Sequence, residues 1–222
     1  MRRFSNPAVP AMLLLVFVMA GWIGGNANRF DVTAVRTLLE IRAASPRLTE
    51  AAVIITWLGS AYATIGLAAL VAIGLALGRR HLSALLLVIT VASERFVMDE
   101  LKLLVERPRP ALDPHPVPIS SFSFPSGHSS NSMTAFLMIA ILAAPARYRK
   151  PAIGVALTTS LLVGASRVYL GVHWPTDVVG GWCLGLTAVW IAVRIGERSG
   201  ALEPEHQIIG GHRTAIDQDQ PV

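Results

Sequence analysis

A histidine and an aspartate in the second half of the chain have the spacing of a catalytic pair. His173 and Asp177 are four residues apart in the segment "HWPTD". If the chain is helical after His173, residues at this spacing share one helix face. An aspartate that accepts a hydrogen bond from one ring nitrogen fixes the imidazole tautomer and raises the nucleophilicity of the other nitrogen. The alternative is a structural role, in which Asp177 forms an ion pair with Arg167 and His173 is an interfacial side chain.

A second histidine, His128, follows a proline, a serine and a glycine at the expected start of a helix. Pro125 cannot lie in a helix interior, whereas Ser126 is a good N-cap for a helix that begins near Gly127. A helix N-terminus has unpaired backbone N–H groups and the positive end of the helix dipole, which together favour an anion such as phosphate. Glycine lets a ligand approach the backbone closely. Alone, these four residues would also fit an ordinary capped helix.

Three cationic side chains accompany the two histidines. Lys102 and Arg109 precede His128, and Arg167 precedes His173 by six residues. A transferred phosphoryl group carries charge on three equatorial oxygens, which such cations and a helix N-terminus can stabilise. One histidine could attack phosphorus while the other protonates the leaving oxygen. The combined set therefore favours phosphoryl transfer.

The segment before Lys102 contains further charged residues. Arg95 and Asp99 are spaced i,i+4 and predict an ion pair on a helix face. Glu94, Asp99 and Glu100 lie together, but no matching oxygen ligands occur elsewhere in the chain. No metal site is therefore expected.

The composition indicates a membrane protein. The chain has 222 residues, of which 53% are hydrophobic and only 15% are charged, and its mean hydropathy is +0.53. Soluble domains carry about 25% charged residues, and a spanning helix needs about 20 mostly apolar residues. The apolar residues are clustered, because five stretches contain no Asp, Glu, Lys or Arg: 4–28, 51–78, 114–146, 151–166 and 178–193.

These stretches, together with the mostly apolar segment 82–104, predict an all-α integral membrane bundle of six transmembrane helices. It would form one domain over residues 1–195, followed by a polar cytoplasmic tail over 196–222 that is expected to be disordered. The first span could instead be a signal peptide, because Arg2 and Arg3 precede its apolar core. Residues 26–50 could form a short amphipathic helix at the interface or a connecting loop. The expected spans are 8–25, 55–77, 82–104, 127–145, 152–169 and 175–194.

Basic residues at the span ends indicate the orientation. Most of them fall on one side, which is therefore expected to be cytoplasmic and to hold both termini, although four arginines between 29 and 47 oppose this orientation. The catalytic site would then lie at the extracytoplasmic ends of the later helices. Since the basic residues do not form a tract, the net charge of +5 does not indicate a nucleic-acid partner. The residues on the cytoplasmic side are Arg2, Arg3, Arg79, Arg80, Arg147, Arg149, Lys150, Arg194 and Arg198.

These motifs resemble those of the type 2 phosphatidic acid phosphatase family, which shares its site with vanadium-dependent haloperoxidases and bacterial acid phosphatases. The family's motifs are Lys-x6-Arg-Pro, Pro-Ser-Gly-His and Ser-Arg-x5-His-x3-Asp. All three occur here in order, with no departure at a motif position: Lys102 to Arg109-Pro110, Pro125 to His128, and Ser166-Arg167 to His173 and Asp177. Arg107-Pro108 is two residues short of the first spacing, so the role is assigned to Arg109.

The resemblance implies a role for each matching residue. His173 would be the nucleophile that forms a phosphohistidine, and Asp177 would hold and polarise it. His128 would be the general acid for the leaving oxygen and then the base that activates water. The resemblance implies no metal and no other cofactor. The residues expected to bind the phosphate are Lys102, Arg109, Ser126, Gly127 through its backbone, and Arg167.

The expected function is therefore that of a lipid phosphatase in a bacterial cytoplasmic membrane. Candidate substrates are undecaprenyl diphosphate, phosphatidylglycerol phosphate, phosphatidic acid and lipid A phosphates, because the motifs read only the phosphate. A lipid phosphotransferase with a non-water acceptor would use the same motifs and is the main alternative. The six spans disfavour a haloperoxidase, since those enzymes are soluble. The missing inverted repeat disfavours a transporter. The sequence does not indicate the oligomeric state.

Overall fold

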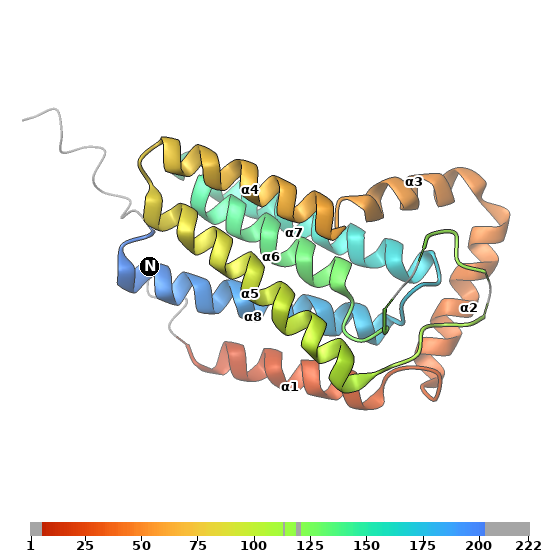
Figure 1. Cartoon of the computed structure of the whole chain (residues 1–222). Coiled ribbons are helices and arrows are strands. Elements are labelled where there is room, and N and C mark those ends of the chain that lie inside the picture. The colour runs from red at the N-terminus through yellow and green to blue at the C-terminus, as the bar shows by residue number, and fades with distance from the viewer. Residues whose placement is uncertain (1–5, 113, 119–120, 203–222) are drawn as a thin grey trace, which may run out of the picture.

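Six helices run side by side, antiparallel in chain order, as an elongated bundle (Figure 1). The computed structural model describes residues 6–112, 114–118 and 121–202, and within them all regular structure is helical. Each of the six expected spans overlaps one of these helices along most of its length. The bundle helices are α1 (Ala8–Ile23), α4 (Ala61–Leu77), α5 (His81–Val105), α6 (Gly127–Ala143), α7 (Ala146–Tyr169) and α8 (Pro175–Ser199).

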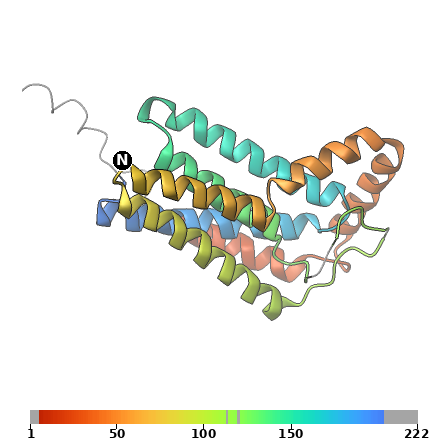
Figure 2. The same cartoon turned by 45° about the horizontal axis from the view of Figure 1, so that its top comes forward.

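Two further helices, α2 (Arg29–Ala44) and α3 (Pro46–Trp57), lie at one end of the bundle (Figures 1 and 2). For residues 26–50, the sequence allowed either a short amphipathic helix or a connecting loop. The structure has helices in most of this segment. The Asn28 side chain caps α2 by accepting hydrogen bonds from the backbone of Phe30 and Asp31. Pro46 begins α3, where a missing backbone N–H costs nothing.

The second expected span is broken. Residues 55–77 were expected to form one helix, but α3 ends at Trp57, α4 begins at Ala61, and the two meet at 45°. The Ser60 side chain caps the new helix by accepting a hydrogen bond from the Ala63 backbone. At the break, a Cβ on Gly59 would lie 2.4 Å from Val163 Cγ1, so only glycine lets this turn pack against α7.

The protein is an integral membrane protein. Helices α5, α7 and α8 are each long and apolar enough to cross a bilayer, and α3 with α4 qualifies as one broken span. Helices α1 and α6 are shorter, with 16 and 17 residues. Large apolar side chains such as Leu70 and Leu85 point outward, where they can contact lipid.

Helix α6 is the central helix, packed against α4, α5, α7 and α8. This position explains why it carries polar residues at membrane depth, since Ser129, Ser130 and Thr134 all face the bundle interior. Glycines on α8 allow the close approach of α6. A Cβ on Gly181 would lie 2.5 Å from the Ser126 carbonyl oxygen.

The folded bundle extends past the predicted domain boundary at residue 195. Helix α8 runs to Ser199, and the buried Ala201 accepts a hydrogen bond through its carbonyl from Ser83 Oγ at 2.6 Å. The rest of the predicted tail, from residue 203, lies outside the described residues. The single cysteine, Cys183, is buried, as expected for a small packing residue.

Candidate active site

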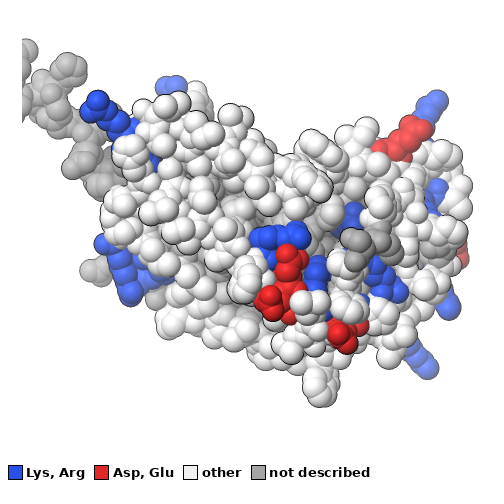
Figure 3. Space-filling view, viewed as in Figure 1, with Lys and Arg blue, Asp and Glu red and all other residues white. Residues whose placement is uncertain are grey.

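The ends of four bundle helices and one loop surround a pocket of about 340 Å³. The N-termini of α4 and α6, the C-terminal parts of α5 and α7, the loop after α5 and the segment before α8 all contribute. Figure 3 shows acidic and basic side chains gathered near the middle of one face, between stretches of uncharged surface, with further charged side chains toward the two ends of the molecule. Six of the eight predicted site residues line the pocket: Lys102, Arg109, Gly127, His128, Arg167 and His173.

The other two predicted residues, Asp177 and Ser126, are fully buried and are absent from the pocket lining. Asp177 is the third residue of α8, and its Oδ2 lies 3.3 Å from His173 Nδ1. The same oxygen accepts a hydrogen bond from the Trp174 backbone at 2.9 Å, which fixes the first turn of the helix. The expected i,i+4 arrangement of His173 and Asp177 is therefore present, although the helix begins only at Pro175.

Two partners select the same tautomer of His173. Asp177 accepts at Nδ1, so this nitrogen carries the proton. Arg109 Nη1 lies 2.9 Å from Nε2 and can only donate, so Nε2 is the acceptor. The lone pair of Nε2 therefore points toward Arg109. Both Arg109 and His173 line the pocket. This is the tautomer that a nucleophilic histidine needs.

Burial largely determines the pKa values of His173 and Arg109. Burial, together with the neighbouring Arg109, holds the pKa of His173 well below 6.5, so its imidazole is neutral at pH 7. Burial also lowers the pKa of Arg109 to about 10, partly opposed by Asp177, and Arg109 therefore stays cationic. Its guanidinium is held by the carbonyls of Ser121 and Val172, each at 2.7 Å.

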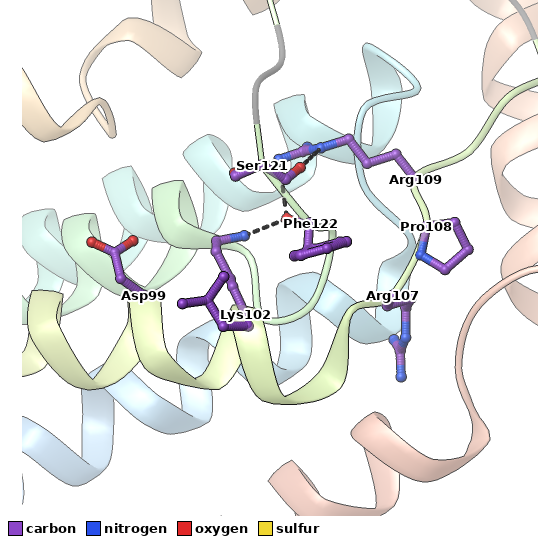
Figure 4. Close-up of a pocket in the computed structure, with 8 residues that line it drawn as sticks. Asp99, Lys102, Arg107, Pro108, Arg109, Ser121 and Phe122 are labelled. Atoms are coloured by element: carbon purple, nitrogen blue, oxygen red, sulfur yellow. Dashed lines mark hydrogen bonds between the residues drawn. The ribbon is translucent and has the colours of Figure 1, made fainter.

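The two other predicted cations are also anchored. Lys102 Nζ donates to the Phe122 carbonyl at 2.6 Å (Figure 4). Arg167 Nη1 donates to Thr56 Oγ1 at 2.9 Å, while its buried Nε has no hydrogen-bond partner among the residues that the structure describes. Arg167 therefore does not form the structural ion pair with Asp177 that was the alternative interpretation.

The start of α6 is where the sequence predicted it. Ser126 occupies the N-cap position, but its side chain makes no capping bond. Instead Ser126 Oγ accepts from Ser129 Oγ at 3.1 Å, and its backbone N–H donates to the Asp177 carbonyl at 3.0 Å. Gly127 and His128 line the pocket beside Arg167 and His173.

Sequence reasoning missed Arg107. The motif spacing assigned the phosphate-binding role to Arg109 and not to Arg107. Figure 4 shows the Arg107 side chain leading away from those of Lys102 and Arg109. Arg107 Nη1 forms the ion pair with Asp177, at 2.8 Å from Oδ1. Its guanidinium also lies 4.5 Å from the Phe124 ring centre. The only signal was a second arginine in "ERPRP".

Ser123 was missed as well. Its hydroxyl donates to Asp177 Oδ2 and lies 3.4 Å from His173 Nδ1. Ser123 is completely buried beside His173 and Asp177. It belongs to a serine-rich segment in which no spacing distinguishes it from its neighbours.

A second cavity of about 590 Å³ adjoins the first (Figure 4). The two share Asp99, Lys102, Arg109 and Ser121. The second cavity adds Arg107 and apolar groups from Leu103, Pro108 and Phe122. The predicted ion pair on α5 is confirmed here, with Arg95 Nε 2.9 Å from Asp99 Oδ2. Among the described residues, no group of three or more His, Cys, Asp or Glu could hold a metal ion.

A helical membrane bundle with a carboxylate-held histidine in a cationic pocket is the arrangement of a membrane-bound phosphatase. Comparison with known families and proteins agrees with that class. The model of the PAP2 superfamily matches residues 83–201. The chain belongs to this superfamily and is a lipid phosphatase.

The relatives include proteins of similar length. Phosphatidylglycerophosphatase B of Bacillus subtilis is 34% identical over 196 residues, which cover 85% of this chain and 95% of the relative. The crystal structure of a transmembrane PAP2-type phosphatidylglycerolphosphate phosphatase from Bacillus subtilis matches with a TM-score of 0.79, covering 85% of this chain and 96% of that one. An undecaprenyl-diphosphatase of Sulfolobus acidocaldarius is 33% identical over 116 residues, or 52% of each chain.

Proposed function

We propose that this protein hydrolyses the terminal phosphate of phosphatidylglycerol phosphate, or of a chemically similar membrane lipid, through a phosphohistidine on His173 and without a metal ion. The observation that carries the proposal is the placement of neutral His173 between Asp177 and Arg109 in a cationic pocket. The substrate class rests on the sequence and structure matches to Bacillus subtilis phosphatidylglycerophosphatase, which extend along most of each chain.

In the first step, His173 Nε2 attacks phosphorus and a P–N bond forms. The bond from phosphorus to the lipid oxygen breaks, and His128 gives its proton to that oxygen. Arg109 must turn from Nε2 to a phosphate oxygen, where it joins Lys102 and Arg167 in balancing the charge of the transition state. Asp177 keeps the proton on Nδ1 and offsets the positive charge that the ring acquires.

In the second step, His128 removes a proton from water, and the hydroxide oxygen bonds to phosphorus. The P–N bond breaks, its electron pair returns to Nε2, and inorganic phosphate leaves. The Gly127 backbone lies at the start of α6, where the helix dipole favours the phosphate oxygens. The same site would transfer the phosphoryl group to a different acceptor if one replaced water.

Lipid access fits the second cavity. It lies beside the catalytic pocket and combines the cations Lys102 and Arg109 with apolar side chains. On the adjoining part of α5, Leu103 and Leu104 are 61% and 79% exposed, as is expected of side chains that face lipid. A head group could therefore enter the catalytic pocket while the rest of the lipid stays in the bilayer.

We further propose six spans in the bacterial cytoplasmic membrane, with both termini cytoplasmic and the pocket on the extracytoplasmic side. The pocket lies at the end of the bundle that also holds α2 and α3 (Figure 1). Basic side chains of the α4–α5 and α6–α7 connections and the end of α8 lie at the opposite end, which supports this orientation.

The test is phosphate release by the purified full chain in detergent with EDTA present. Wild type and His173→Ala are compared on phosphatidylglycerol phosphate, undecaprenyl diphosphate, phosphatidic acid and a lipid A phosphate. We expect release by wild type alone, with the highest kcat/KM on phosphatidylglycerol phosphate. The matched control is His81→Ala, because His81 is exposed at the far end of the bundle.

Three results would contradict the proposal: loss of activity in EDTA, full activity of folded His173→Ala, or a clear preference for another lipid. Transfer of phosphate to an added alcohol at the expense of hydrolysis would indicate a phosphotransferase. Orthovanadate, which mimics five-coordinate phosphorus, is expected to inhibit wild type at low concentration.

A further inference from the structure

Asp31 of α2 caps the N-terminus of α8 from a different helix. Its carboxylate is completely buried. Oδ1 accepts from the Thr176 backbone N–H at 3.1 Å, and Oδ2 accepts from Thr176 Oγ1 at 2.6 Å and from the Gly25 backbone at 2.7 Å. Thr176 is the second residue of α8, where a backbone N–H has no partner within its own helix. The positive end of the helix dipole favours a carboxylate at this position.

Thr176 connects this cap to the catalytic pair. Its Oγ1 also accepts a hydrogen bond from Arg107 Nη1 at 3.0 Å. The same Nη1 donates to Asp177 Oδ1 at 2.8 Å, and Asp177 in turn holds His173. The contacts therefore run without a gap from α2 to the nucleophilic histidine.

Arg107 is held in this position from a second direction. Its Nη2 donates to the carbonyl of Ala20 at 2.8 Å and to that of Gly21, both near the end of α1. The packing is tight on this side, because a Cβ on Gly24 would lie 1.9 Å from Thr176 Oγ1 and 2.6 Å from Arg107 Nη1.

The charges of the cluster also matter. Asp31 and Asp177 contribute two negative charges and Arg107 one positive charge, and all three side chains are at most 5% exposed, so solvent screens them little. These three side chains therefore carry a net charge of −1 on the Nδ1 side of His173, whereas Arg109 lies at Nε2. When Nε2 bonds to phosphorus the imidazole ring becomes cationic, and this negative charge offsets it.

We propose that Asp31 and Thr176 are positioning residues for the His173–Asp177 pair, acting through Arg107. The inference rests on the proposed function, because it concerns the step in which His173 is phosphorylated. Neither residue lines the catalytic pocket. Their loss is therefore expected to lower kcat and to leave substrate binding nearly unchanged. If they only capped the helix and stabilised the fold, the folded protein would keep the wild-type kcat and KM.

The experiment measures kcat and KM for Thr176→Val, Thr176→Ser and Asp31→Asn in detergent, beside wild type and His173→Ala. We expect Thr176→Val and Asp31→Asn to lower kcat about tenfold with KM changed by less than about twofold, as for other residues that act through a contact network. Thr176→Ser keeps the hydroxyl, so its kcat should stay close to the wild-type value. The control is Thr187→Val on the same helix, whose hydroxyl bonds only to the Cys183 carbonyl at 2.8 Å.

The outcomes separate this inference from the proposed function. If wild type is active, His173→Ala is inactive, and both Thr176→Val and Asp31→Asn match wild type, then the inference is wrong and the proposed function stands. A fall in kcat that only parallels the loss of folded protein in a thermal melt, or that Thr176→Ser fails to restore, would also overturn it. If wild type is inactive on every lipid, the proposed function fails and the inference falls with it.

Discussion

Arg107 Nη1 lies 2.8 Å from Asp177 Oδ1, in an ion pair whose side chains are only 5% and 0% exposed. The other oxygen, Oδ2, is surrounded by Ser123 Oγ, the Trp174 backbone N–H and His173 Nδ1. Both carboxylate oxygens of Asp177 are therefore hydrogen-bonded, and Arg107 balances its charge behind the pocket. Taking charges out of water is costly, so removing one partner of such a pair leaves the other charge uncompensated.

Replacing Arg107 with glutamine is expected to cost about 3–5 kcal/mol of stability, because Asp177 would remain buried without its counter-ion. A fall in kcat of about a hundredfold or more should follow, since the orientation of His173 depends on Asp177. The measurements are a thermal melt in detergent and phosphate release.

The matched control is Arg194→Gln. Arg194 pairs with Glu197 at 2.8 Å, but these side chains are 30% and 21% exposed and lie far from the site. An ion pair of this kind is worth about 1 kcal/mol or less. Equal melting shifts for the two variants would show that burial of the Arg107–Asp177 pair has no energetic consequence.

Removal of the Ser123 hydroxyl tests the second contact to Asp177. Ser123→Ala deletes a donor to Oδ2 of a charged carboxylate, which is worth about 1.5–3 kcal/mol. We expect kcat to fall by about tenfold or more, while KM stays near the wild-type value, because Ser123 does not line the pocket. Ser160→Ala is the control, since that buried hydroxyl bonds only to the carbonyl of Ala156 in its own helix. Wild-type kcat in folded Ser123→Ala would remove this serine from the catalytic arrangement.

The pH dependence of kcat/KM follows from the lowered pKa of His173. As the proposed nucleophile, His173 must be neutral, and its pKa lies well below 6.5 because of burial and the nearby Arg109. His173 therefore stays neutral when the pH falls from 7 to 6.5. The loss of kcat/KM at low pH, which protonation of His173 causes, is expected below pH 6.5.

Arg109→Gln removes the nearest positive charge, so the pKa of His173 should rise and the acid limb should move to higher pH. The variant also loses a proposed phosphate contact, which would lower the rate at every pH. The pH at which the acid limb falls is therefore compared, and not the maximal rate. Using one substrate for both enzymes cancels the ionisation of the substrate phosphate. An acid limb at the same pH in both enzymes would contradict the assignment of this limb to His173.

Local patterns were enough to predict the parts of the site that depend on helix geometry. The i,i+4 spacing placed His173 beside Asp177, and Ser126 correctly marked the start of α6. The apolar stretches located all six bundle helices to within a few residues at most ends. The break at Gly59 was missed, because apolar residues continue through it and hydropathy does not register a 45° bend.

The contacts behind the pocket could not be predicted in this way. Arg107 and Arg109 lie in an irregular segment, where no periodicity tells which way a side chain points. Asp31 reaches Thr176 across 145 positions of sequence, and no local signal in α2 records that contact. Such side chains are identified only by the packing of α1, α2 and α8.

The close packing of α8 against α6 gives a final prediction. A Cβ on Gly181 would lie 2.5 Å from the Ser126 carbonyl oxygen and 2.9 Å from Ser129 Cβ, and a backbone atom cannot move aside as a flexible side chain can. Gly181→Ala should therefore destabilise the protein by about 1–3 kcal/mol. It should also lower kcat, because it displaces the start of α6 and with it His128.

The control is Gly66→Ala, since nothing lies within 4 Å of a Cβ built there. In a helix this change is expected to stabilise by about 0.5–1 kcal/mol. Melting temperatures in detergent should therefore shift in opposite directions, and a stabilised, fully active Gly181→Ala would show that α6 and α8 are less tightly packed at this point.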